Sequence, residues 1–138
     1  MIEINNLTSF AVDKKFFVRV AKKVLKGENR GIENISIAFV SPAEIKKLNQ
    51  KYRKKHKPTD VLSFGRALGP KSDSSEVVIC PEVVKNNAKE FSTTFKKELT
   101  KMLIHGLLHI LGYEHEGPEK MALEMAKKQE KYLSKFKF

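Results

Sequence analysis

Three of the four histidines in the chain, His105, His109 and His115, lie within eleven residues of one another. His105 and His109 are four residues apart in a segment with helical periodicity, which places their Cβ atoms roughly 5–6 Å apart on one face. His115 follows Gly112, where we expect the helix to end, and a turn there can return the third ring to the same face. A lone histidine on an apolar face is more often a hydrogen-bonded core residue. Three imidazoles in this arrangement instead favour a catalytic zinc site with one open position.

Position 106 argues against one kind of zinc enzyme. The three histidines and Gly112 match the metalloprotease pattern H-E-x-x-H-x-x-G-x-x-H, but Gly106 stands where that pattern has glutamate. The glutamate is the general base of the protease. The spacing therefore favours a metal site, and Gly106 disfavours peptide hydrolysis by that route. Glycine at this position also lets another chain segment or a substrate approach the helix closely.

The hydrophobic pattern divides the chain into about four strands and about five helices. The expected strands span residues 1–6, 35–40, 60–64 and 76–79. The expected helices span residues 13–26, 42–54, 82–91, 95–111 and 118–136. Strands with helices between and after them indicate an α+β or a layered α/β architecture. The histidine pair lies on the fourth of these helices, near the C-terminus of the sequence.

Local residue signals mark several helix ends. Asp13 and Ser41 are candidate N-caps, because their side-chain oxygens can accept unpaired backbone N–H groups of a first turn. Gly27 is a candidate helix stop, and Gly112 is a candidate left-handed cap. On the last helix, the side chains expected to face inward are Met121, Met125 and Leu133.

The composition is that of an ordinary globular protein except for its charge. The chain has 138 residues, of which 41% are hydrophobic and 31% charged, and we expect a single domain over residues 1–138. It carries 27 Lys and Arg against 16 Asp and Glu, which gives a net charge of +11. A field of this sign attracts polyanions, nucleic acid first and anionic membranes second. The alternative is a solvated, lysine-rich surface without a polyanionic partner.

The cysteine content and the lack of long apolar segments indicate the compartment. Cys80 is the only cysteine, which excludes an internal disulfide and suits a reducing compartment. A lone cysteine in an apolar run is more often a small buried hydrophobe than a nucleophile. The first residues lack the pattern of a signal peptide, and no apolar run approaches the roughly 18–20 residues that span a bilayer. We therefore expect a soluble cytoplasmic protein that does not enter a membrane.

Two blocks of sequence carry a family resemblance. The first is LNQKYR at 48–53 followed by PTDVLSF at 58–64, and the second is HGLLHILGYEH at 105–115. In their order and separation they are similar to the YbeY family of bacterial endoribonucleases and ribosomal RNA maturation factors, over nearly the whole chain. The positions that depart from the usual family pattern are Glu114 (for Asp), Gly65 (for Pro) and Ser75-Glu76 (for Gly-Asp).

The resemblance implies an α+β fold in which about five helices, including a metal-binding helix near the C-terminus, pack with a small mixed sheet of about four strands. It implies one Zn²⁺ per chain on His105, His109 and His115, and Ni²⁺ accepts the same ligands. It implies an endoribonuclease that cleaves single-stranded RNA, matures the 3′ end of 16S ribosomal RNA and acts in ribosome quality control. The implied partners are single-stranded RNA, small-subunit ribosomal RNA and the ribosome. The functional arginine of the family falls on Arg53, so Arg53 and His109 are the catalytic candidates.

Each further candidate residue has an ordinary structural explanation beside its functional one. Arg53 can bind a phosphate through two parallel hydrogen bonds. The alternative is a solvated cation that the dipole of a helix end favours. Asp60 and Glu114 can orient a ligand histidine, whereas turn chemistry is the alternative for Asp60. Ser63 either lines the cleft or packs in a strand. Tyr113 stacks on a base, caps the metal pocket or packs at the helix end.

Two other functions stay open at this stage. The first is a metal-dependent hydrolase of another substrate class, which Gly106 and the positive charge disfavour. The second is a non-catalytic, zinc-stabilised ribosome assembly factor, which predicts salt-dependent RNA binding without turnover. In the favoured function, zinc lowers the pKa of a bound water toward about 7, Arg53 positions the phosphodiester and the lysines attract RNA.

Overall fold

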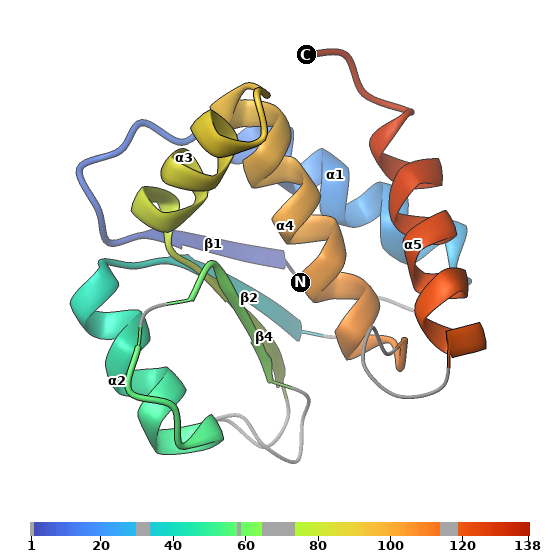
Figure 1. The fold of residues 1–138 in the computed structure, drawn as a ribbon. Coiled ribbons are helices and arrows are strands. Elements are labelled where there is room, and N and C mark those ends of the chain that lie inside the picture. The colour runs from blue at the N-terminus through green and yellow to red at the C-terminus, as the bar shows by residue number, and fades with distance from the viewer. Residues whose placement is uncertain (1, 30–33, 58, 65–73, 114–118) are drawn as a thin grey trace.

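The computed structural model describes residues 2–29, 34–57, 59–64, 74–113 and 119–138, which form a four-stranded mixed sheet and five helices (Figure 1). The strands are β1 (Ile2–Asn6), β2 (Asn34–Phe39), β3 (Val61–Phe64) and β4 (Ser74–Ile79). Their order across the sheet is β1-β2-β4-β3. The first three strands in this order are parallel, and β3 pairs antiparallel with β4 at one edge. The expected α+β class with a small mixed sheet is confirmed.

Two of the helices, α1 and α2, begin at the capping residues that the sequence indicates. They are α1 (Lys14–Gly27), α2 (Pro42–Arg53), α3 (Pro81–Glu90), α4 (Phe95–Ile110) and α5 (Glu119–Leu133). Asp13 Oδ1 accepts a hydrogen bond from the backbone N of Phe16 at 3.1 Å, and Ser41 Oγ accepts one from Glu44 N at 3.2 Å. The last helix ends three residues earlier than expected, because the backbone turns after Leu133.

The two candidate glycine stops have different roles. Gly112 has a φ of +102°, and the backbone N of Tyr113 donates to Leu108 O at 3.0 Å, so the predicted left-handed end of α4 is confirmed. Helix α1 also ends at Gly27, but the residue with positive φ is Asn29, at 54°. Gly27 instead makes room for Tyr132, since an added Cβ would lie 2.5 Å from the hydroxyl oxygen of that tyrosine.

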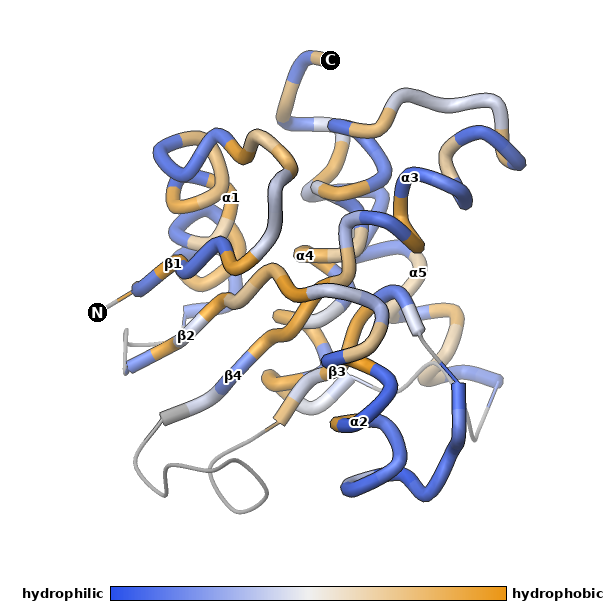
Figure 2. Tube along the Cα trace, turned by 90° about the vertical axis from the view of Figure 1, so that its left-hand side faces the viewer, coloured by the Kyte–Doolittle hydropathy of each residue, from blue (hydrophilic) through white to orange (hydrophobic). Residues whose placement is uncertain are grey.

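Hydrophobic side chains pack on both faces of the sheet. Helices α1, α4 and α5 contribute to the core on one face, and α2 covers the other. The sheet residues in the first core are Ile35, Ile37, Phe39, Val77 and Ile79. The sheet residues in the second core are Leu62, Phe64 and Val78. Figure 2 shows hydrophobic residues along β2 and in the second half of β4, whereas α2 is largely hydrophilic, as expected for central strands and a surface helix.

Helix α5 lies beside α4 and runs antiparallel to it (Figure 1). Of its three side chains expected to face inward, Met125 and Leu133 are buried, but Met121 is 38% exposed. The prediction for Met121 is wrong because Ala122, one helical turn before Met125, occupies the inward position instead. Within the residues that the structure describes, no helix combines the length and apolar character needed to cross a membrane.

Candidate active site

Helix α4 presents His105 and His109 on successive turns of one face. Their ring centroids lie 4.8 Å apart, with the rings edge to face at 80°, and both residues are half-buried. The helical spacing in the sequence therefore brings these two imidazoles together as expected. His115 and Glu114, the other candidates from this block, lie outside the described residues.

The nitrogen chemistry of this pair suits a divalent metal. His105 Nδ1 lies 2.8 Å from Gln129 Oε1 of α5. A carbonyl oxygen can only accept, so Nδ1 carries the hydrogen and Nε2 of the neutral ring carries the lone pair that a metal would bind. Among residues 2–29, 34–57, 59–64, 74–113 and 119–138, no three His, Cys, Asp or Glu side chains gather closely enough to hold an ion. The pair thus supplies two donors of the right type, and the third predicted donor lies in the undescribed segment.

Gly106 brings α4 against the sheet between the two histidines. An added Cβ at this position would lie 2.8 Å from Val77 Cγ1, 3.0 Å from Ser63 Oγ and 3.3 Å from Val61 Cγ2. Ser63 Oγ donates a hydrogen bond to the backbone oxygen of Gly106 at 3.0 Å. Close approach of a chain segment, one of the two explanations offered for glycine here, is confirmed, and that segment is the sheet.

The end of β3 contacts both α4, which carries the histidine pair, and α2, which ends at Arg53. Successive residues of a strand point to opposite faces. Ser63 bonds to Gly106 on α4, whereas the next residue, Phe64, packs its ring 4.8 Å from that of Tyr52 on α2. Arg53 is the last residue of α2, so the helix that ends at Arg53 and the helix that carries the histidine pair lie on opposite faces of the sheet.

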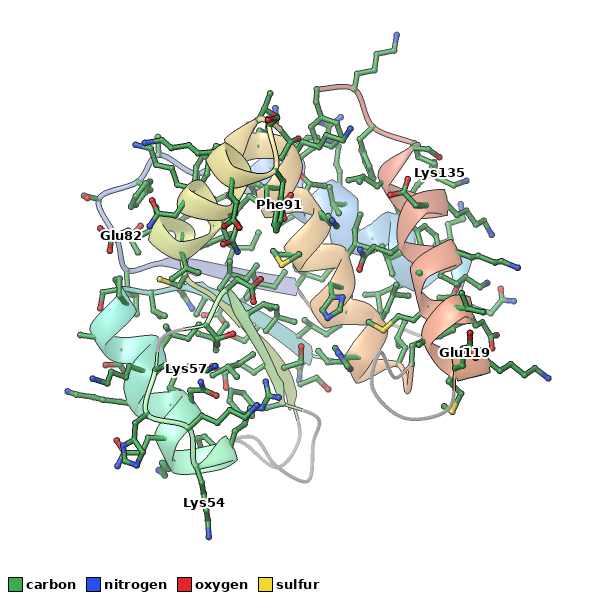
Figure 3. All side chains as sticks on the ribbon, viewed as in Figure 1. Lys54, Lys57, Glu82, Phe91, Glu119 and Lys135 are labelled. Carbon is green, nitrogen blue, oxygen red and sulfur yellow. The ribbon has the colours of Figure 1, made fainter. Side chains whose placement is uncertain are left out.

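A basic segment follows α2 and is held against it. Lys54 adopts a left-handed conformation, with φ 56°, and ends the helix directly after Arg53. The side chain of Asn49 is buried and donates through Nδ2 to the backbone oxygen of Lys57 at 2.9 Å, which folds the segment back along α2. Residues 51–57 are all exposed, and Lys54 projects away from the fold (Figure 3). Arg53 and its cationic neighbours are therefore accessible to a large anionic ligand.

Asp60 has local bonding partners. Its Oδ1 accepts from the backbone N of Val61 at 2.9 Å and from Thr59 Oγ1 at 3.3 Å. Its backbone oxygen accepts from Cys80 N at 2.9 Å, which ties the start of β3 to the end of β4. These contacts are the turn chemistry offered as the ordinary explanation for Asp60. Cys80 is fully buried, and desolvation raises the pKa of its thiol, in line with a packing role.

A buried carboxylate directly after α1 anchors the chain on both sides of the undescribed segment 114–118. Glu28, whose side chain is 8% exposed, accepts from Tyr113 Oη at 2.6 Å and from Lys128 Nζ at 3.2 Å. It also accepts from Tyr132 Oη. Burial by itself raises the pKa of Glu28, but the bonds from its three partners outweigh this and hold the pKa below 4.5. The bond to Glu28 raises the pKa of Tyr113 to about 12.

Sequence reasoning missed this anchor, because nothing local marks Glu28 as different from other glutamates. Tyr113 packs at the helix end, which is one of the three roles considered for it. Its bond to Glu28 fixes the chain two residues before His115.

We expect Glu28→Gln to lower the free energy of unfolding by about 1–3 kcal/mol near pH 7, because two tyrosine hydroxyls and a half-buried ammonium lose their charged acceptor. The folded-state pKa of Glu28 is depressed, so its contribution is present above pH 4.5 and is lost as the pH falls through the folded-state pKa. The variant should therefore lose less stability than the wild type on acidification below pH 4.5. Urea unfolding measured across this pH range tests both effects.

The exposed Glu90 on α3 offers a matched control. Glu90→Gln should give the wild-type unfolding curve at every pH. Identical acid dependence in the wild type and Glu28→Gln would contradict the anchoring role of the carboxylate.

Fold and site together define a class, namely α+β proteins that present paired imidazoles from a helix packed on a four-stranded mixed sheet. A sequence profile described as "Endoribonuclease YbeY" matches residues 3–137. The chain belongs to this family, as the resemblance indicated.

Relatives of the same name include proteins from two thermophilic genera. Endoribonuclease YbeY of Thermotoga petrophila is 46% identical over 103 residues, covering 75% of this chain and 67% of that protein. Endoribonuclease YbeY of Thermosipho melanesiensis is 36% identical over 129 residues, covering 94% of this chain and 91% of that protein. A solution structure of a Thermotoga maritima protein is similar at a TM-score of 0.69 and 36% identity, covering 97% of this chain and 87% of the other.

Proposed function

We propose that this chain is an endoribonuclease that cleaves single-stranded RNA in the cytoplasm. Its substrate is the 3′ end of 16S ribosomal RNA during maturation of the small subunit, and it also acts in ribosome quality control. The observation that carries the proposal is the pairing of His105 and His109 on α4. This turn of α4 contacts the end of the edge strand β3, and the next residue of β3 contacts the end of α2, where Arg53 lies. Family membership and the net charge of +11 support RNA as the substrate class.

One Zn²⁺ per chain would be held by His105, His109 and His115, and Ni²⁺ is the alternative ion. When bound, the ion supplies Lewis-acid activation of the phosphodiester. The protein's own part is to hold the first two rings in a fixed mutual orientation. Gly106 and Ser63 contribute by seating this turn of α4 on the sheet.

The placement of Arg53 favours a flexible RNA strand. Neighbouring residues of β3 contact α2 and α4, so a phosphate backbone that reaches both Arg53 at the end of α2 and the histidine pair would bend past the β3 edge. A single strand bends in this way readily, and its unpaired bases are accessible, unlike those of a rigid A-form duplex. The exposed lysines around Arg53 would attract the strand through its phosphates.

We expect Arg53→Ala to lower kcat/KM for single-stranded RNA by about 100-fold, since one preorganised donor on a developing charge is worth this much. Arg53→Lys should recover only part of the loss, because lysine keeps the charge but cannot make two parallel hydrogen bonds to a phosphate. Steady-state cleavage of a labelled oligonucleotide measures both values.

Lys55→Ala is the matched control in the same exposed segment. It should weaken RNA binding and leave kcat unchanged. The slope of log binding constant against log salt concentration should fall by about one, the value for one lost phosphate contact. If Arg53→Ala behaves in the same way as Lys55→Ala, Arg53 contributes only to the general attraction of RNA.

The proposal itself is tested by cleavage of single-stranded and duplex RNA under conditions free of other nucleases. The wild type and a histidine variant are purified in parallel from a nuclease-deficient host. Cleavage by the wild type alone supports the enzyme. Equal residual cleavage by both samples, together with salt-dependent binding, would instead indicate a non-catalytic assembly factor.

A further inference from the structure

We infer that Gln129 of α5 is a positioning residue for the metal centre, because it fixes the tautomer and ring orientation of His105. This inference rests on the proposed role of His105 as a metal ligand. Neither the sequence motif nor the helical spacing pointed to Gln129, which is separated from His105 by 24 residues.

The contact between the two side chains determines which nitrogen can bind a metal. His105 Nδ1 lies 2.8 Å from Gln129 Oε1, which is the distance of a good N–H···O hydrogen bond. Since Oε1 has no hydrogen to give, this bond requires the tautomer with hydrogen on Nδ1. The lone pair then resides on Nε2. Ligand histidines typically donate their second N–H to a carboxylate, carbonyl or water in this way.

Helix α5 is held firmly enough to make Gln129 a fixed acceptor. Met125, one turn earlier, and Leu133, one turn later, are both buried in the core. Lys128 and Tyr132, on either side of Gln129 in sequence, both bond to Glu28, which caps the end of α1. Figure 3 shows α5 alongside α4, with Glu119 labelled at the start of α5 and Lys135 just beyond its end. The amide is therefore presented to His105 from a helix that is tied down on both sides of the contact.

Three variants separate a positioning role from simple packing. Gln129→Met keeps the length and helix preference of the side chain but removes the strong acceptor. Gln129→Glu keeps an acceptor for Nδ1–H. Gln50→Met makes the same replacement as the first variant at an exposed site on α2, away from this contact. Zinc dissociation constants are measured by competition with a chelator, beside thermal unfolding of each metal-free protein.

Zinc binding should weaken by about 10–100-fold in Gln129→Met, the usual cost of losing a partner of a ligand histidine. It should stay within a few-fold of wild type in Gln129→Glu and in Gln50→Met. Wild-type zinc affinity in Gln129→Met would overturn the inference. An equal loss in Gln129→Met and Gln129→Glu would also overturn it, because packing rather than the acceptor would then matter.

A second measurement does not depend on metal at all. Nitrogen-15 NMR of the metal-free protein, at a pH where the rings are neutral, reports which nitrogen of His105 carries hydrogen. We expect the Nδ1–H form in the wild type and a mixture of both tautomers in Gln129→Met. A wild type with hydrogen on Nε2 would overturn the inference.

The two proposals fail in distinguishable ways. A wild-type protein that binds no zinc overturns the metal centre of the proposed function. Tight zinc binding that is indifferent to residue 129 overturns only the role of Gln129.

Discussion

His109→Ala should abolish stoichiometric zinc binding and reduce cleavage of single-stranded RNA by more than about 100-fold. Loss of a residue that merely orients a ligand costs about 10–100-fold, so loss of a ligand itself costs more. The ring of His109 lies edge to face with that of His105, and its removal leaves the second imidazole without the neighbour needed for shared coordination. Metal analysis of the purified protein and cleavage kinetics measure the two effects.

Two controls separate the loss of a metal ligand from general effects of replacing a histidine. His56 is the histidine outside the cluster and is exposed after α2, so His56→Ala should keep zinc and activity. Half-buried His109 can be truncated without opening a deep cavity, so thermal unfolding of metal-free His109→Ala should stay close to that of the wild type. Full activity in a stably folded His109→Ala protein would remove the basis of the proposed enzyme.

Gly106→Ala should destabilise the protein by about 1–3 kcal/mol, the usual cost of overpacking a filled interface. In an exposed helix the same change would stabilise by up to about 1 kcal/mol. Here the new Cβ would lie 2.8 Å from Val77 Cγ1, and Val77 is a fully buried residue of a central strand. Denaturant unfolding gives the change in free energy directly.

The same substitution should also lower activity, because Gly106 lies between the two histidines of α4. Any shift of α4 away from β3 lengthens the hydrogen bond from Ser63 Oγ to Gly106 O. The same shift displaces the rings of both histidines along with the helix. Val77→Ala removes the nearest clashing methyl group, so the double variant should be more stable than the sum of the two single changes predicts. Strict additivity, or a gain in stability from Gly106→Ala alone, would contradict this account of the contact.

The parts of this fold that could be predicted from sequence are those governed by neighbouring residues. Asp13 and Ser41 cap helices through bonds to residues three positions ahead, and Gly112 ends α4 through its own φ. The pairing of His105 and His109 follows from helical geometry alone. In each case the decisive interaction spans four residues or fewer, so the sequence pattern contains it.

The interactions that could not be predicted join residues distant in sequence. Glu28 meets Tyr132 across 104 residues, and Gln129 meets His105 across 24. No local pattern distinguishes these side chains from other surface glutamates and glutamines. The packing of α2, which ends at Arg53, on the face of the sheet opposite α4 likewise depends on the order of the strands and the connections between them, which strand composition does not specify.

The bond between Glu28 and Tyr132 also has a consequence for the order of events during synthesis. Glu28 is made early, whereas Tyr132 and Gln129 emerge about a hundred residues later. Until then Glu28 lacks its partners from α5, Lys128 and Tyr132, and α4 lacks the helix that fixes the first imidazole. A growing chain that already contains both histidines of α4 therefore has their rings without their final orientation, and it gains that orientation only when α5 has been translated and docked.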